Sequence, residues 1–240
     1  MRNLYIALSL ATALCAGQAT AGELFADSFD GGNLAEKWDV LRPNADAYAV
    51  EGGELLLLSS KRGALGDETA ENVLMPKVEL PAGDWTMHVK FSGEFQTAVE
   101  ELQFGIFADH DTVVWGSVGT RGDQYYGWGI FAAAGRSDGD RAFQFRRDML
   151  SLGCNVCGPD RMFPNFAATI PQPIEARFEK RGQQYVLSAK LGADSSQWTE
   201  IERITAIGAA GRPFLVLRQA GEVKGETLLK IDSFAIESHG

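Results

Sequence analysis

Cysteine and histidine are scarce in this chain of 240 residues, which contains three of each. Cys15 lies in the N-terminal segment, so Cys154 and Cys157 are the only cysteines of the remaining chain. A structural zinc site usually takes four cysteine or histidine ligands, and no second ligand pair accompanies these two cysteines. The histidines stand in no recognisable nucleophile context, which disfavours a Ser-His-Asp hydrolase.

Positive charge is also in deficit. The chain carries 22 Lys and Arg against 32 Asp and Glu, a formal net charge of −10. Proteins that bind nucleic acid or anionic lipid present basic patches or stripes, and this sequence contains none. The composition therefore predicts no nucleic-acid partner, and it leaves neutral polysaccharide, oligosaccharide or another protein as candidates.

Long apolar runs are missing after the N-terminal segment. In the N-terminal segment itself, Arg2 precedes an apolar run over residues 4–16, and the small residues at 19–21 suit a signal peptidase. This run is shorter than the roughly 20 residues that a membrane-spanning helix requires. We therefore predict a cleaved signal peptide at 1–21, a secreted or periplasmic location, no membrane insertion, and a single domain over 22–240.

Helical periodicity is absent, and alternation with a period of two residues takes its place. In the segment 85–91, Trp85, Met87, Val89 and Phe91 fall on one face, and the segments 174–180 and 185–191 alternate in the same way. Gly- and Asp-rich turns separate such segments. The pattern predicts an all-β fold, a two-sheet antiparallel β-sandwich of about a dozen strands. A shift of apolar phase after Ile231 predicts a β-bulge in the last strand.

The two remaining cysteines lie in "SLGCNVCGPDRMFP". In an exported protein, this spacing favours a local disulfide between Cys154 and Cys157 that braces a loop. A zinc site and a redox motif are the alternatives, although the Gly- and Pro-rich flanks favour a loop over the helix start that a redox motif requires.

Three segments carry a family resemblance. "FADSFDGGNLAEKWDV", "YAVEGGELLLL" and "KIDSFAIE" resemble the concanavalin A-like lectin/glucanase superfamily, above all the jelly-roll modules at the C-termini of β-xylosidases and their stand-alone secreted relatives. "ELQFGIFADHDTVVWGSVG" is similar to the central hairpin of those modules. The resemblance implies a jelly roll whose last strand lies beside the first. In it, Trp38 would plug the end of the sandwich and the pair Gly31-Gly32 would supply a permissive turn.

The resemblance also implies a structural calcium ion. Its ligands would be the Asp27 carboxylate, the Gly53 carbonyl and the Asp232 carboxylate, completed by water, and calcium accepts such mixed oxygen sets. In the alternative interpretation, both aspartates are ordinary solvent-facing strand residues.

Catalytic motifs of the superfamily are missing. The Glu-x-Asp-x-x-Glu of its hydrolases places two carboxylates on one strand face, whereas Glu100 and Glu101 are adjacent and would point to opposite faces. The Gln-x-His of its alginate-lyase-like members is also absent. We therefore predict no catalytic residue.

Aromatic residues gather among glycines in "VVWGSVGTRGDQYYGWGIF". Flat rings beside fixed polar groups are typical of sugar-binding sites, so we predict carbohydrate binding by Trp115, Arg121, Tyr125, Tyr126 and Trp128. The alternative is that these rings fill and cap the core. The sequence thus favours a carbohydrate-binding protein over a glycoside hydrolase or polysaccharide lyase of the same fold, and over a structural or interaction domain without a sugar site.

Overall fold

The computed structural model describes residues 22–59, 70–94, 100–109, 112–123, 127–138, 144–149, 173–191, 196–206, 208, 210–219 and 227–239. These residues form one short 3-10 helix, η1 (Ala45–Ala47), and fifteen strands, more than the dozen predicted. The strands are β1 (Gly22–Asp27), β2 (Trp38–Leu41), β3 (Tyr48–Glu51), β4 (Glu54–Ser59), β5 (Val73–Pro76), β6 (Trp85–Glu94), β7 (Glu100–Asp109), β8 (Thr112–Asp123), β9 (Gly127–Asp138), β10 (Gln144–Met149), β11 (Ile174–Arg181), β12 (Gln184–Leu191), β13 (Thr199–Thr205), β14 (Arg212–Gln219) and β15 (Thr227–Ser238).

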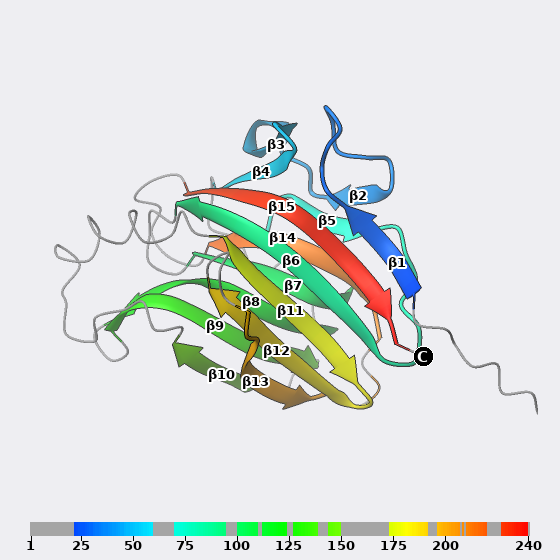
Figure 1. Ribbon diagram of the computed structural model, residues 1–240, viewed down its shortest axis with the longest axis vertical. Helices are drawn as coiled ribbons and strands as arrows, with labels where there is room; N and C mark the ends of the chain where they lie inside the picture. The colour runs from blue at the N-terminus through cyan, green and yellow to red at the C-terminus, as the bar shows by residue number, and fades with distance from the viewer. Residues whose placement is uncertain are drawn as a thin grey trace, which may run out of the picture.

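The strands pair into two antiparallel sheets that stack as a sandwich (Figure 1). The eight-stranded sheet has the order β13-β12-β11-β6-β15-β4-β3, with β1 also paired to β15. The seven-stranded sheet has the order β10-β9-β8-β7-β14-β5-β2. The predicted all-β sandwich is confirmed, and β7 and β8 form the hairpin expected from the resemblance.

The last strand joins the two ends of the chain. Along one edge β15 pairs with β6, and along the other it pairs first with β4 and then with β1. The register of β15 against β6 shifts between Ile231 and Ser233, which confirms the predicted bulge. The first and last strands are therefore neighbours, as the resemblance implied.

Alternation decides which side chains form the core. One face of β6 is buried in the core between the two sheets, as predicted, and its side chains are those of Trp85, Met87, Val89 and Phe91. On β12, however, both faces are buried, because Val186 and Ser188 are buried along with their alternating neighbours. A strand covered on both sides loses the simple alternation of exposure on which the prediction rests.

One end of the sandwich is closed by an aromatic cluster, which we call the Trp38 plug. Trp38 is 5% exposed, and its ring lies 4.9 Å from Phe25, 6.1 Å from Phe29 and 5.5 Å from Phe234 between ring centroids. Its indole Nε1 donates a hydrogen bond of 2.6 Å to the Asp27 carboxylate. The predicted role of Trp38 as a plug is confirmed.

In this region, Phe29 adopts an unusual backbone conformation with a positive φ of 55°. We expected the permissive residues to be Gly31 and Gly32, but neither has a positive φ. A bulky residue rarely adopts such a φ. Here the Phe29 amide donates to Asp27 Oδ1 at 3.0 Å and the ring is buried against Trp38, so the hydrogen bond and the packing together hold the strained residue.

Candidate functional site

The adjacent glutamates of β7 point to opposite faces of the seven-stranded sheet, as predicted. Glu100 enters the sandwich, where it accepts a hydrogen bond of 2.8 Å from Ser59 and another from Thr227. Glu101 instead lies on the outer face, where Arg218 Nη1 approaches its Oε1 at 2.5 Å. One glutamate is therefore part of the interior, and the other is available for a surface site.

Glu101 is the centre of a polar group that we call the Glu101 cluster, made of Glu101, Gln103, Ser117 and Arg218. Besides Arg218, its Oε1 accepts from Gln103 at 3.2 Å, and its Oε2 accepts from Ser117 at 2.8 Å. The side chains of Glu101 and Arg218 are 15% and 27% exposed, so the cluster keeps some contact with solvent. These contacts fix the carboxylate and the guanidinium in one arrangement.

Small residues form the floor beside this cluster. The antiparallel registers bring five of them to the outer face of three central strands: Gly105, Ser117, Gly119, Ala133 and Gly135. Trp115 packs on this floor, since a Cβ at Gly135 would lie 2.5 Å from its ring. The floor continues on the other side into a buried apolar group with Val113, Phe214 and Val216. All five floor residues are buried, so solvent reaches this region through the partly exposed side chains of Glu101 and Arg218.

The structure places three of the five predicted carbohydrate-binding residues, Trp115, Arg121 and Trp128, on the paired strands β8 and β9. Trp115 is 4% exposed, so its ring offers a ligand little flat surface in this arrangement. The backbones of Arg121 and Trp128 belong to the paired strands β8 and β9, while Tyr125 and Tyr126 lie outside the described residues. Since Gly119 pairs with Glu101, Arg121 follows two residues further along the same strand. The predicted segment therefore begins next to the Glu101 cluster.

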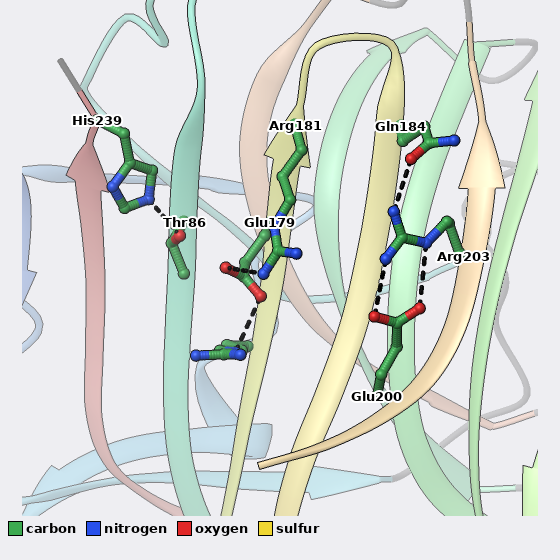
Figure 2. A network of polar contacts seen from close by, with 8 residues as sticks. Thr86, Glu179, Arg181, Gln184, Glu200, Arg203 and His239 are labelled. Carbon is green, nitrogen blue, oxygen red and sulfur yellow. Dashed lines mark hydrogen bonds and ion pairs between the residues drawn. The ribbon is translucent and has the colours of Figure 1, made fainter.

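The eight-stranded sheet carries a different kind of polar surface (Figure 2). Glu179 contacts Arg177 at 2.9 Å and Arg181 at 3.0 Å, and Arg203 binds Glu200 through two of its nitrogens. The Arg203–Glu200 pair is exposed, and exposed ion pairs contribute little to stability, while Glu179 is 8% exposed and has both arginines as ion-pair partners. The outer face of the seven-stranded sheet is therefore the better candidate site.

His88, on β6, gives the eight-stranded sheet a pH-dependent element. Its ring lies 6.0 Å from that of Trp198, and burial lowers its pKa below 6.5 against the opposing effect of Glu237. Arg177 also lowers this pKa, while Glu179 and Glu175 raise it. Because the unfolded chain binds this proton more readily than the folded protein, stability decreases as the pH falls below about 6.5.

We therefore expect His88→Gln to lose less stability in acid than the wild type. Urea unfolding between pH 7.5 and 5 measures this effect as the difference between the two proteins. The difference should grow in favour of the variant as the pH falls. Parallel curves would show that His88 makes no contribution.

The residues predicted to bind calcium have separate partners. The Asp27 carboxylate is engaged by Trp38 and Phe29, with Lys37 Nζ at 3.6 Å, whereas Asp232 pairs with Lys90 at 2.9 Å. Within the described ranges, no three Asp, Glu, His or Cys side chains are grouped to hold a metal ion. The predicted set has only two carboxylates and a backbone carbonyl, so the calcium site stays a prediction.

Two other predicted features fall outside the described residues: the signal peptide at 1–21 and the disulfide between Cys154 and Cys157. In the part of the chain that the structure describes, no helix has the length and apolar character needed to cross a membrane.

Comparison with known proteins identifies the fold. No protein-family model and no curated protein sequence matches this chain. Among solved structures, the GH43 protein BlXynB from Bacillus licheniformis superposes with a TM-score of 0.65 at 12% identity, and a xylan β-1,4-xylosidase from Bacillus halodurans superposes with 0.62 at 13%. The fold that this chain shares with them is a two-sheet β-sandwich of the jelly-roll type.

The extent of these matches differs between neighbours. The jelly roll covers 89% of this chain but only 39% of each of the two enzymes, so it corresponds to a part of them. It covers 91% of this chain and 96% of a CBM2 module from the evolved Dit protein of Lactobacillus casei phage J-1, with a TM-score of 0.55 and 12% identity. At such identities, the likeness establishes the fold alone.

Proposed function

We propose that this protein is an exported carbohydrate-recognition protein that binds a neutral glycan on the outer face of the seven-stranded sheet. The observation that carries the proposal is the Glu101 cluster, fixed beside a floor of small residues and next to the Trp115–Trp128 segment. Neighbours of the same fold include a CBM2 module and parts of a xylosidase, which supports glycan recognition as the general function.

The Glu101 cluster has the donors and acceptors that sugar hydroxyls need. A carboxylate offers about four acceptor positions, and the contacts of Glu101 with Arg218, Gln103 and Ser117 occupy three of them. A further acceptor remains for a hydroxyl group, and the guanidinium of Arg218 retains donors beyond the one that contacts Glu101. Because the side chains are already fixed, a ligand would bind with little additional ordering.

The overall charge favours a neutral glycan over a polyanion. A protein with a formal net charge of −10 repels anionic polysaccharides at long range. The Glu-x-Asp-x-x-Glu motif, which places the two carboxylates of a glycosidase on one strand face, is absent from the sequence. These features support binding over hydrolysis.

The test is a neutral-glycan array, followed by titration calorimetry with the best ligand. We expect Arg218→Gln and Glu101→Gln to weaken binding by about tenfold or more, since each removes a charged hydrogen-bonding partner. The matched control is Arg203→Gln, which removes an arginine paired with Glu200 on the other sheet and should bind as the wild type does. Equal binding by all four proteins would contradict the proposed site, and hydrolysis of the glycan would contradict the proposed function.

A further inference from the structure

A cavity of about 660 Å³ opens at the end of the sandwich, between the two sheets. Its lining includes the apolar residues Val78, Leu80, Pro81, Trp85, Ile106 and Tyr185. Trp85, Ile106 and Tyr185 are at most 3% exposed, so the partly exposed Val78, Leu80 and Pro81 supply the accessible apolar surface. Trp85 and Tyr185 come from the eight-stranded sheet and Ile106 from the seven-stranded sheet. A cavity of this volume and character lies within the range of small-molecule sites in proteins, about 300–1,000 Å³.

Polar contacts between backbone and side chains hold the rim of this cavity in place. Lys180 Nζ donates to the carbonyl oxygens of Ala82 at 2.5 Å and Gly83 at 2.9 Å, and the Gly182 amide donates to Asp84 at 2.7 Å. These bonds join the loop before β6 to the β11–β12 turn. The Ala206 amide then donates to the Gln183 carbonyl at 3.1 Å, which joins that turn to the segment after β13. The cavity is therefore preformed, which reduces the entropy lost on binding.

Glycines keep the mouth of the cavity open. Gly182 and Gly208 both line it, and both adopt positive φ values, 61° and 68°. No atom lies within 4 Å of the position that a Cβ would take at either residue. The entrance is therefore free of side chains at these two points, and a ligand can pass the backbone closely.

The charges at the rim favour an anionic head group. An ammonium group has three donors, and Lys180 uses two of them on backbone carbonyls, so one donor and the full charge remain for a ligand. No ion pair of Lys180 is found within the described ranges. Arg212, also on the rim, is already paired with Asp39 at 2.5 Å, and this hydrogen bond lowers the pKa of Asp39. Glu79 is exposed, so solvent screens its repulsion of an anion.

We propose that this cavity binds a small amphipathic carboxylate, with its aliphatic or aromatic body against Val78, Leu80 and Pro81 and its carboxylate at Lys180. The site is separate from the proposed glycan site, because it lies between the sheets instead of on the outer face of one sheet. Its ligand differs as well, since a neutral glycan has no anionic group for Lys180.

Titration calorimetry with octanoate, octylamine and octan-1-ol tests the proposal. The three probes share one chain and differ in the charge of the head group. We expect octanoate to bind about tenfold or more tightly than octylamine, with octan-1-ol between them, because Lys180 attracts the carboxylate and repels the ammonium. Equal affinities for octanoate and octylamine, or no binding of any probe, would overturn the proposal.

Two variants and one control locate the binding. Lys180→Gln keeps hydrogen-bond donors for the loop carbonyls but removes the charge, so octanoate affinity should fall to about that of octan-1-ol. Lys90→Gln removes a lysine that pairs with Asp232 on the same sheet and should leave octanoate affinity unchanged. Ala210→Trp, at an exposed position on the rim, should abolish binding by filling the mouth. Unchanged octanoate affinity in Ala210→Trp, with an unchanged melting temperature, would place any binding elsewhere and overturn the proposal.

Discussion

Trp38→Ala should lower the free energy of unfolding by about 3–5 kcal/mol, the cost of removing a large buried aromatic side chain. Trp38 lies at the centre of the plug, within 6.1 Å of three other rings between centroids. Its removal leaves a cavity and deprives Asp27 of the indole donor. Phe29 would also lose the stacked partner that helps to hold its positive φ. Urea unfolding, followed by circular dichroism, measures the loss.

Two variants separate packing from hydrogen bonding in the plug. Trp38→Phe keeps an aromatic ring but removes the indole donor, so we expect a loss of about 1–2 kcal/mol, near the usual value of a hydrogen bond to a charged group. Asp27→Ala removes the acceptor of both Trp38 and Phe29 and should cost about 1–3 kcal/mol. A Trp38→Ala variant no less stable than Trp38→Phe would show that the ring packing contributes nothing.

Thermal melting tests the calcium ion predicted from the sequence. We expect EDTA to lower the melting temperature and added calcium to restore it, and an unchanged melting temperature would rule out the predicted site. A decrease in EDTA that calcium reverses would establish the ion, and it would require Asp27 to exchange one of its present partners for the metal.

Patterns local to one strand could be predicted from the sequence. The alternation over 85–91 identified the buried face of β6, and the change of phase after Ile231 located the bulge of β15. Adjacent positions on an extended strand must point to opposite faces, which separated Glu100 from Glu101. The resemblance of the first and last segments implied that they are neighbouring strands, and β1 does pair with β15.

Contacts that depend on strand order could not be predicted. Arg218 lies 117 residues from Glu101, and they meet because β14 pairs with β7. The alternation in the sequence indicates that Glu101 and Gln103 lie on the same face of their strand. It does not indicate which strand lies beside them, so it could not predict the contact with Arg218. The burial of Trp115 could not be predicted either, because alternation assigns a residue to a face of the sheet but does not indicate whether other residues cover that face. The conformation of Phe29 depends on long-range packing against Trp38, which overrides the local preference for glycine.

The second large effect is expected at Glu100, which is fully buried where the two sheets face each other. Its Oε1 accepts from Ser59 of β4 at 2.8 Å and its Oε2 accepts from Thr227 of β15, so one side chain of the seven-stranded sheet bonds two strands of the other sheet. The Thr227 amide also donates to the Ser59 hydroxyl at 3.2 Å. Glu100→Ala removes the shared acceptor of both hydroxyls and leaves a cavity, and it should cost about 3–5 kcal/mol.

A triple variant separates two quantities: the net contribution of this polar group to the free energy of unfolding, and the penalty for leaving the two buried hydroxyls without their acceptor. Replacing all three side chains by apolar ones of similar size, as Glu100→Leu, Ser59→Ala and Thr227→Val, removes the donors together with the acceptor. Such replacements are often close to neutral, because the two hydroxyl donors and their carboxylate acceptor are removed together, and here only the bond from the Thr227 amide to the Ser59 hydroxyl is lost besides. We therefore expect the triple variant to be more stable than Glu100→Ala by at least about 2 kcal/mol in urea unfolding. Equal losses in both variants would mean that the polar group itself stabilises the sandwich, so that Glu100 contributes more than the satisfaction of two buried hydroxyls.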